Sequence, residues 1–240
     1  MLACLALALV SPKLLVVDNL VIGSFDGKTW KKLPENSKSS ESLELKAVNF
    51  DSVGGTRTVL GYRESEVGGT FLNVDEFERG VFVTGLSPKF PRKVTKLGTS
   101  SKTYLDIAAA ALKAHKSPSK AALAAVYSVD LDGDGTQEVI IEGRSAGFTR
   151  ESTMDGNKSK HSLLIVRGIG KKGVQTHEIM VSGGPEGASE YGTIRSIVDL
   201  DGDGKMEIIA SIDYYEGQSA SVYSWNKGVF KKILENGAGV

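Results

Sequence analysis

Short apolar runs separated by turns rich in Gly, Asp and Lys fill the second half of the chain. Runs of this length, with many Val, Ile and Tyr residues, predict β-strands rather than helices. The first group of four runs is 123-LAAVYSVDL, 138-EVIIEG, 162-SLLIVRG and 174-VQTHEIMV. The second group is 193-TIRSIVDL, 207-EIIASIDYY, 219-SASVYSW and 229-VFKKIL. Each group predicts an antiparallel meander with one acidic hairpin and one hairpin that contains Gly and Lys.

The chain also repeats itself. The stretch 129-VDLDGDGTQEVII-141 recurs with few changes as 198-VDLDGDGKMEII-209, and 24-SFDGKTWKKL-33 aligns without a gap on 224-SWNKGVFKKI-233. A weaker copy of the acidic hairpin, with one extra residue in the turn, lies at 48-VNFDSVGGTRTVLGY-62. Repeats of this kind predict a mainly β fold of repeated four-stranded antiparallel β-meander units, β-propeller-like, either closed into a small propeller or stacked openly.

One segment departs from the strand pattern. Residues 103-TYLDIAAAALKAHK-116 are rich in Ala and predict a helix that ends at Ser117-Pro118. Thr103 and Asp106 have the spacing of a capping box. One face of this helix should pack on the sheets, and its residues are Tyr104, Ala108, Ala111, Leu112 and His115.

The predicted organisation therefore has four parts: a signal-peptide remnant at 1–11, an N-terminal β region with a decayed repeat at 12–100, a helix and linker at 101–118, and two acidic-loop repeats at 119–240. The run 1-MLACLALALV-10 is as long as a signal-peptide core and too short to span a bilayer. We expect an exported protein without a transmembrane segment: secreted, periplasmic or on the cell surface. The alternative is a buried N-terminal strand. Cys4, the sole cysteine, excludes a disulfide framework within the chain and resembles a lipoprotein processing site only faintly.

Charge narrows the class of partner. The chain has 29 basic and 29 acidic residues, which argues against a general nucleic-acid binder. Residues 91–120 are locally basic, because seven Lys or Arg residues there face Asp106 alone. This stretch is either a solvated linker that offsets the acidic loops or a contact surface for an anionic polymer.

The acidic hairpins carry the candidate chemistry. Asp occupies loop positions one, three and five, Gly allows a sharp bend at position six, and Glu stands at position nine. Carboxylates this close repel one another unless a cation lies between them. A shell of carboxylate and carbonyl oxygens suits Ca²⁺ better than Zn²⁺ or copper, and better than Mg²⁺ with its stricter geometry. We therefore expect two structural calcium ions, one per loop. The alternative is a Gly/Asp hairpin that binds nothing.

The first six loop positions match an EF-hand, but an EF-hand needs Glu at position twelve and flanking helices. Position twelve is Ile141 or Ala210, and strand-like residues follow. The pattern D-x-D-G-D-G-x-x-E before an aliphatic strand instead resembles the calcium loop of FG-GAP and VCBS repeats. These are the β-propeller blades of integrin alpha chains and of many secreted bacterial proteins.

The resemblance covers 126–142 and 195–211 closely and the two full units, roughly 120–236, more loosely. It implies that the metal ligands are Asp130, Asp132, Asp134, the Thr136 carbonyl and Glu138, and in the second loop Asp199, Asp201, Asp203, the Lys205 carbonyl and Glu207. The chain departs from the family in two respects. It has no clear Phe-Gly or Gly-Ala-Pro segment upstream of either loop, and its units are too few for the family's large propellers.

These patterns together predict an exported calcium-binding β-repeat protein that acts as a binding or scaffolding module at the cell envelope, with a protein or glycan ligand. We find no Gly-x-Ser-x-Gly elbow, no phosphate loop and no His–acid motif, so we predict no catalytic residues and no enzyme. One alternative is a lectin-like carbohydrate-binding module, with a sugar face formed by Tyr214, Tyr215, Tyr223 and Trp225. The other is a hydrolase or lyase on a propeller scaffold.

Overall fold

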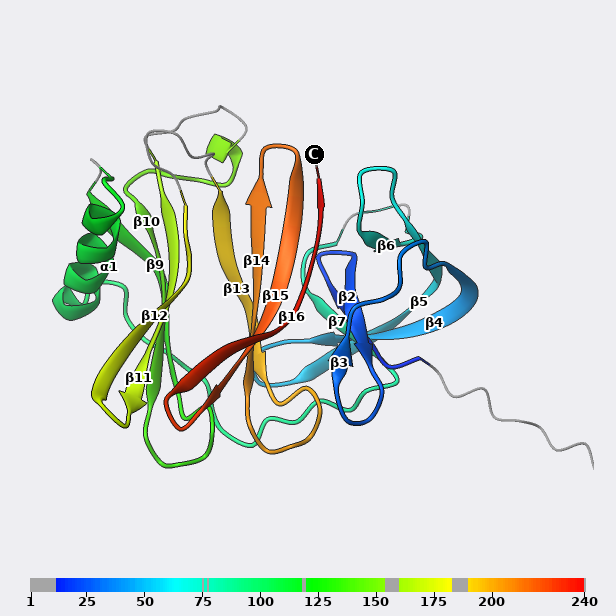
Figure 1. Ribbon diagram of the computed structural model, residues 1–240, viewed down its shortest axis with the longest axis horizontal. Helices are drawn as coiled ribbons and strands as arrows, with labels where there is room; N and C mark the ends of the chain where they lie inside the picture. The colour runs from blue at the N-terminus through cyan, green and yellow to red at the C-terminus, as the bar shows by residue number, and fades with distance from the viewer. Residues whose placement is uncertain are drawn as a thin grey trace, which may run out of the picture.

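The computed structural model describes residues 12–74, 76, 78–117, 120–153, 160–182 and 190–239. Its strands form three antiparallel sheets, arranged side by side with helix α1 (Lys102–Ala114) at one end (Figure 1). The predicted signal remnant at 1–11, with Cys4, lies outside the described residues. No helix in the described part of the chain is long and apolar enough to cross a membrane.

The N-terminal sheet closes on itself as a six-stranded barrel. Its strands follow the order β1-β7-β4-β5-β6-β2, and β1 pairs with β2 to complete the circle, while the short β3 (Trp30–Lys31) extends β2. The barrel strands are β1 (Leu14–Val17), β2 (Leu20–Phe25), β4 (Ser39–Val48), β5 (Val53–Glu64), β6 (Thr70–Leu72) and β7 (Val81–Thr84). Every residue of β1 is buried, because one face points into the barrel and the other packs on the next sheet.

The other two sheets follow chain order. The first-loop sheet contains β8 (Thr95–Lys96), β9 (Ala121–Val129), β10 (Glu138–Ser145), β11 (Ser162–Gly170) and β12 (Gly173–Val181). The second-loop sheet contains β13 (Tyr191–Val198), β14 (Glu207–Tyr214), β15 (Gly217–Asn226) and β16 (Val229–Gly239). A short 3-10 helix, η1 (Glu151–Thr153), lies between β10 and β11.

Apolar layers hold these bodies together. Ala108 and Leu112 of α1 pack on the outer face of the first-loop sheet, against residues such as Ile141. The two loop sheets share a second core that includes Leu164 and Trp225. A third core joins the second-loop sheet to β1, β2 and β7 of the barrel, and a fourth fills the barrel. The second-loop sheet is therefore buried on both faces.

The mainly β fold with one helix is confirmed. The sequence did not predict the barrel, and the described residues do not show a propeller. Residues 48–62, interpreted as a decayed repeat, form the β4–β5 hairpin of the barrel, with Val48 opposite Val53. Closure depends on pairings such as β1 with β7, which join segments far apart in the chain, so no local pattern announces it.

Two local predictions are confirmed by pairing and burial. In the aligned hairpins, Phe25 pairs with Trp30 just as Trp225 pairs with Phe230. Helix α1 lies where the Ala-rich segment predicts it and packs Tyr104, Ala108, Ala111 and Leu112 on the sheet, whereas His115, predicted on the same face, is exposed. The capping box is wrong, because the N-cap is Ser101 and makes no side-chain cap hydrogen bond.

Candidate metal centre

The first acidic loop connects β9 to β10 and folds around its own carboxylates. Asp130 accepts hydrogen bonds from the backbone N–H groups of Gly133, at 2.6 Å, and Gly135, at 3.0 Å. Asp134 accepts from the N–H of Thr136, and Glu138 accepts from the N–H of Leu131. These bonds bend the chain sharply inward, and both glycines take positive φ angles that suit a residue without Cβ.

The second loop, between β13 and β14, repeats this geometry. Asp199 accepts from Gly202, at 2.7 Å, and from Gly204, at 3.0 Å. Asp203 accepts from Lys205, and Glu207 from the N–H of Leu200. The glycine φ angles agree with those of the first loop within a few degrees, 82° and 84° against 79° and 86°. The two stretches therefore share a backbone conformation as well as a sequence.

Each loop brings three carboxylates within 4.8 Å of one another. In the first loop these belong to Asp130, Asp132 and Glu138, and in the second to Asp199, Asp201 and Asp203. Asp134 and Glu207 are predicted ligands that do not belong to these groups, although both help to fold their loops. Like charges in this arrangement repel unless a proton or a cation offsets them.

Burial further raises the free energy of the charged carboxylates in both loops. Desolvation raises the pKa of Glu138 to about 7, and the charges of Asp132, Asp134 and Asp130 add to that rise. Desolvation likewise raises the pKa of Glu207 well above its usual range, with the aspartates of its loop contributing.

The two loops differ in their nearest cation. Burial raises the pKa of Asp203, but the Lys205 ammonium, 2.8 Å away, outweighs it and holds that pKa below its usual value. The first loop has Thr136 in the corresponding position.

One carboxylate oxygen has no partner within the described protein. Oδ1 of Asp132 is buried and accepts no hydrogen bond, whereas Oδ2 of the same group accepts the backbone N–H of Lys227 at the β15–β16 turn. A buried acceptor without a partner costs about 1–3 kcal/mol. An oxygen in this position, among other carboxylates, fits a cation ligand.

The loops lie against each other, which the repeat pattern did not predict. The backbone N–H of Met206 donates to the carbonyl of Leu131 at 2.8 Å. Arg92 donates to the carbonyls of Asp130 and Leu131 in the first loop and of Gly204 in the second. Although the loops belong to different sheets, their backbones touch and they share one guanidinium.

The chain segment before β8 ties the loops together. Lys89 forms an isolated antiparallel bridge with Asp199, and β8 then pairs with β9. Arg92 lies between these two pairings. It belongs to the basic stretch 91–120, one interpretation of which is a linker whose positive charge balances the negative charge of the acidic loops. For Arg92 the contacts support that interpretation, because its guanidinium lies on both loops.

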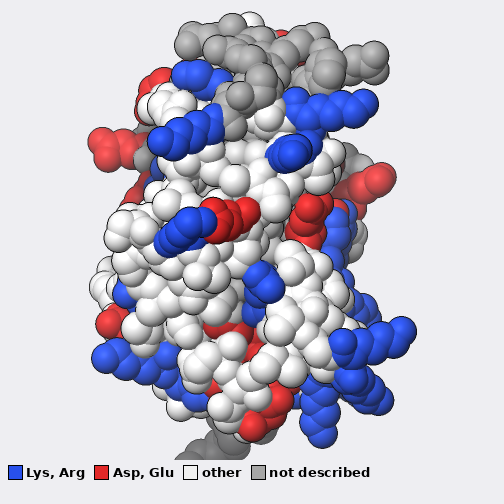
Figure 2. All heavy atoms as spheres, turned by 90° about the vertical axis from the view of Figure 1, so that its left-hand side faces the viewer, with Lys and Arg blue, Asp and Glu red and all other residues white. Residues whose placement is uncertain are grey.

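The rest of the basic stretch gives a mixed surface. The face covered by α1 carries some Lys and Arg side chains dispersed among acidic and uncharged residues and others gathered at the lower right of the view (Figure 2). On it Lys102 pairs with Asp106 at 2.6 Å, and His115 contacts Glu178 at 3.0 Å. The contact surface for an anionic polymer stays a prediction.

No protein-family model, curated protein or solved structure matches the chain. The resemblance to FG-GAP and VCBS repeats therefore rests on the acidic loops and the strands beside them.

The predicted aromatic sugar face is not present as one surface. Trp225 and Tyr223 are buried in the core between the loop sheets, where Tyr223 stacks on Phe230. The Tyr214 hydroxyl donates to the carbonyl of Ala238, at 2.9 Å, with that of Gln218 also in reach at 3.2 Å, and of the four side chains only Tyr215 is largely exposed. Tyr223 and Trp225 share the face of β15 that is buried in this core, and Tyr215 lies beyond the end of β14, so the four side chains do not form one exposed surface.

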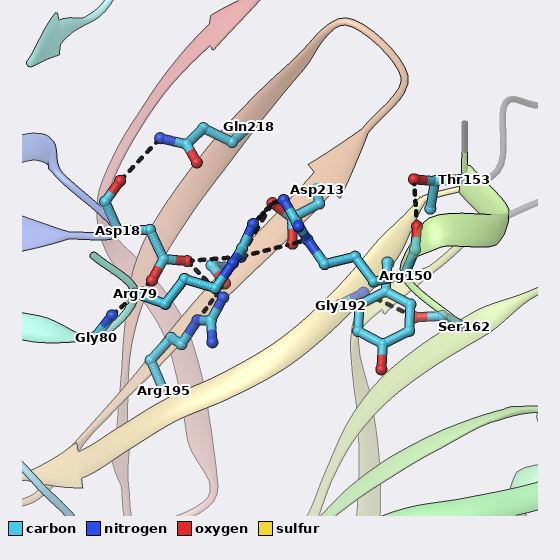
Figure 3. A network of polar contacts seen from close by, with 12 residues as sticks. Asp18, Arg79, Gly80, Arg150, Thr153, Ser162, Gly192, Arg195, Asp213 and Gln218 are labelled. Carbon is cyan, nitrogen blue, oxygen red and sulfur yellow. Dashed lines mark hydrogen bonds and ion pairs between the residues drawn. The ribbon is translucent and has the colours of Figure 1, made fainter. Parts of the chain in front are cut away.

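A second polar cluster, which the sequence did not predict, joins the barrel to both loop sheets (Figure 3). Its acids are Asp18, in the β1–β2 turn, and Asp213, on β14, and both are buried. Arg79, before β7, and Arg150, after β10, both donate to Asp213, and Arg195, on β13, donates to Asp18. We call these five residues the arginine junction.

Proposed function

We propose that the chain is an exported calcium-binding protein whose two acidic loops each hold one Ca²⁺ as a structural ion. The observation that carries this proposal is the duplication of a loop conformation that gathers three carboxylates within 4.8 Å. In a hairpin turn that binds no ion, this conformation would be unfavourable, because it brings like charges close together. Its presence in both loops therefore favours one bound ion in each.

The donor set fits calcium. Every candidate ligand is an oxygen, and calcium takes six to eight oxygen ligands at about 2.3–2.6 Å. The partnerless Oδ1 of Asp132 supplies a ligand atom that nothing else in the described protein uses. Water can complete the shell on the exposed side, where Asp134 lies.

We further propose that the two loop sheets are copies of one meander unit of the FG-GAP or VCBS kind. Both have their acidic hairpin between the first and second strands of the unit, and both have the sequential order β9 to β12 or β13 to β16. On this proposal the calcium loops fix the hairpins by which neighbouring units touch, and the protein serves as a binding or scaffolding module at the cell envelope.

Changing one acid in each loop tests the assignment of ions. We expect Asp132→Ala to remove the ion of the first loop and Asp201→Ala that of the second, since each loses a central carboxylate. Calorimetric titration should then count one ion in each variant. Because Arg92 contacts both loops, the remaining ion should bind a few-fold more weakly, equivalent to a coupling of about 0.5–1 kcal/mol.

The matched control is Asp51→Ala. Asp51 is an exposed acid in the β4–β5 turn and bonds only to its neighbour Ser52 among the described contacts. Its loss should leave both ions in place. If Asp132→Ala left two ions bound, the first loop would not be the site.

A substitution of the lysine in the second loop should strengthen calcium binding rather than weaken it. The Lys205 ammonium occupies one oxygen of Asp203 and adds positive charge beside the ion. Lys205→Thr, which copies the first loop, should tighten calcium binding at the second loop by about tenfold, or 1.4 kcal/mol. Weaker binding in this variant would show that Lys205 supports the site.

The partner of the module is a protein or a glycan. The aromatic residues predicted to bind sugar do not form one exposed surface, which favours a protein ligand over a glycan ligand. A glycan array with calcium present separates these two: binding to a defined sugar would revive the lectin alternative, and a blank array leaves the protein partner. We also propose that the chain is not an enzyme, and a screen with ester, phosphate and glycoside substrates tests this directly.

A further inference from the structure

A cavity of about 400 Å³ opens beside the arginine junction, where the barrel approaches the second-loop sheet. Its walls combine charged and apolar groups. Arg79, Arg150, Asp213, Glu216 and Gln218 form the polar part, and Val67, Phe71 and Ala238 form the apolar part. None of the acidic-loop residues lines this cavity, so a ligand bound in it would need no calcium.

Arg150 is held in a fixed orientation at this cavity. Its Nε donates to Oδ2 of Asp213 at 2.8 Å and its Nη2 to Oδ1 at 3.0 Å, which is the two-pronged geometry of a guanidinium on a carboxylate. The side chain is nevertheless 45% exposed. The remaining nitrogen, Nη1, has no acceptor in the described part of the chain, and its direction is set by the two bonds that hold the rest of the group.

The carboxylates of the junction are already occupied. Asp213 accepts from Arg79 at 3.1 Å as well as from Arg150. Asp18 accepts from the backbone N–H of Gly80 at 2.8 Å and from Arg195. The carboxylate oxygens of the junction therefore all accept hydrogen bonds from the protein itself, and Nη1 of Arg150 is left to an acceptor from outside.

The walls indicate which kind of anion suits Nη1 of Arg150. Glu216 at the rim is exposed, and its charge would repel an anion with two or more negative charges more strongly than one with a single charge. The side chains of Phe71 and Val67 offer apolar surface near the guanidiniums. A cavity with a fixed polar group and apolar walls is typical of small-molecule sites.

We propose that this cavity binds a small organic anion with one carboxylate and a short apolar group. The carboxylate lies on Arg150, and the apolar group packs on Phe71 and Val67. Such a ligand supplies the acceptor that Nη1 of Arg150 lacks among the described residues. It also contacts both the barrel and the second-loop sheet, so its binding stabilises their contact.

Benzoate is a suitable probe, and benzamide is its neutral counterpart of the same shape. Titration of the ¹⁵N-labelled full chain should give saturable shifts of the Arg150 Nε–Hε signal with benzoate. Benzamide should give none. Arg150→Gln should weaken benzoate binding by about tenfold or more, as expected for the loss of a charge-assisted hydrogen bond.

A second pair of variants leaves the junction untouched. Val67 is 47% exposed and lines the cavity without belonging to the charged cluster. Val67→Glu should abolish benzoate binding by repulsion, whereas Val67→Gln, of the same size without the charge, should change it less than threefold. Equal effects of these two variants, absence of saturable shifts with benzoate, or tighter binding of inorganic phosphate than of benzoate would overturn the proposal.

Discussion

Replacing Asp213 by alanine should lower the free energy of unfolding by about 3 kcal/mol, because it removes the buried carboxylate that two partly exposed guanidinium groups share. Asp213 is 4% exposed and accepts from both Arg79 and Arg150. We choose the lower end of the range for broken buried pairs because Arg150 is partly hydrated. Urea denaturation followed by tryptophan fluorescence measures the change.

The matched control is Asp106→Ala. Asp106 pairs with Lys102 on the exposed face of α1, with its side chain 63% exposed. An exposed helical pair contributes about 0.3–0.5 kcal/mol. If Asp213→Ala cost no more than Asp106→Ala, the arginine junction would not hold the barrel and the loop sheets together.

Calcium should raise the melting temperature by about 10–20 °C over that of chelator-treated protein. An ion that binds only the native state adds roughly 2.7 kcal/mol at a hundredfold excess over its dissociation constant, so two ions add about 5 kcal/mol. For a chain of this size, each kcal/mol corresponds to about 2–4 °C. Calorimetric melts with calcium chloride and with EGTA measure the difference.

Two controls distinguish specific calcium binding from a general effect of salt on the melting temperature. Magnesium chloride at the same ionic strength should give a much smaller shift, since Mg²⁺ demands a stricter octahedral geometry. The double variant Asp132→Ala, Asp201→Ala should melt at the same temperature with calcium and with EGTA. Superimposable melts of the unchanged protein in the two solutions would contradict a structural role for calcium.

The acidic loops could be located from the sequence because their signal is local. Turn glycines, alternating carboxylates and flanking aliphatic strands all fall within a few positions of one another, and the structure forms hairpins at both places. The register of the two Gly/Lys hairpins followed from direct alignment for the same reason.

The contacts between the loops, and those of the arginine junction, could not be predicted from local sequence patterns. Arg92 reaches Gly204 across 112 positions, and Arg79 reaches Asp213 across 134. In the sequence Arg92 is one of seven basic residues in a stretch that is rich in lysine, and nothing in its neighbours distinguishes it. Closure of the barrel has the same character, because it depends on pairing between β1 and β7.

Counting calcium ions by calorimetric titration of the chelator-treated full chain tests the central claim most directly. We expect two ions, since each duplicated loop supplies a group of close carboxylates, and one ion in each single-loop variant. The β4–β5 turn should add none, because Asp51 stands there without neighbouring acids and Arg57 lies in the following strand. A count of zero would show that the loops are metal-free hairpins, and a third ion lost with Asp51→Ala would show that the β4–β5 turn is an intact repeat.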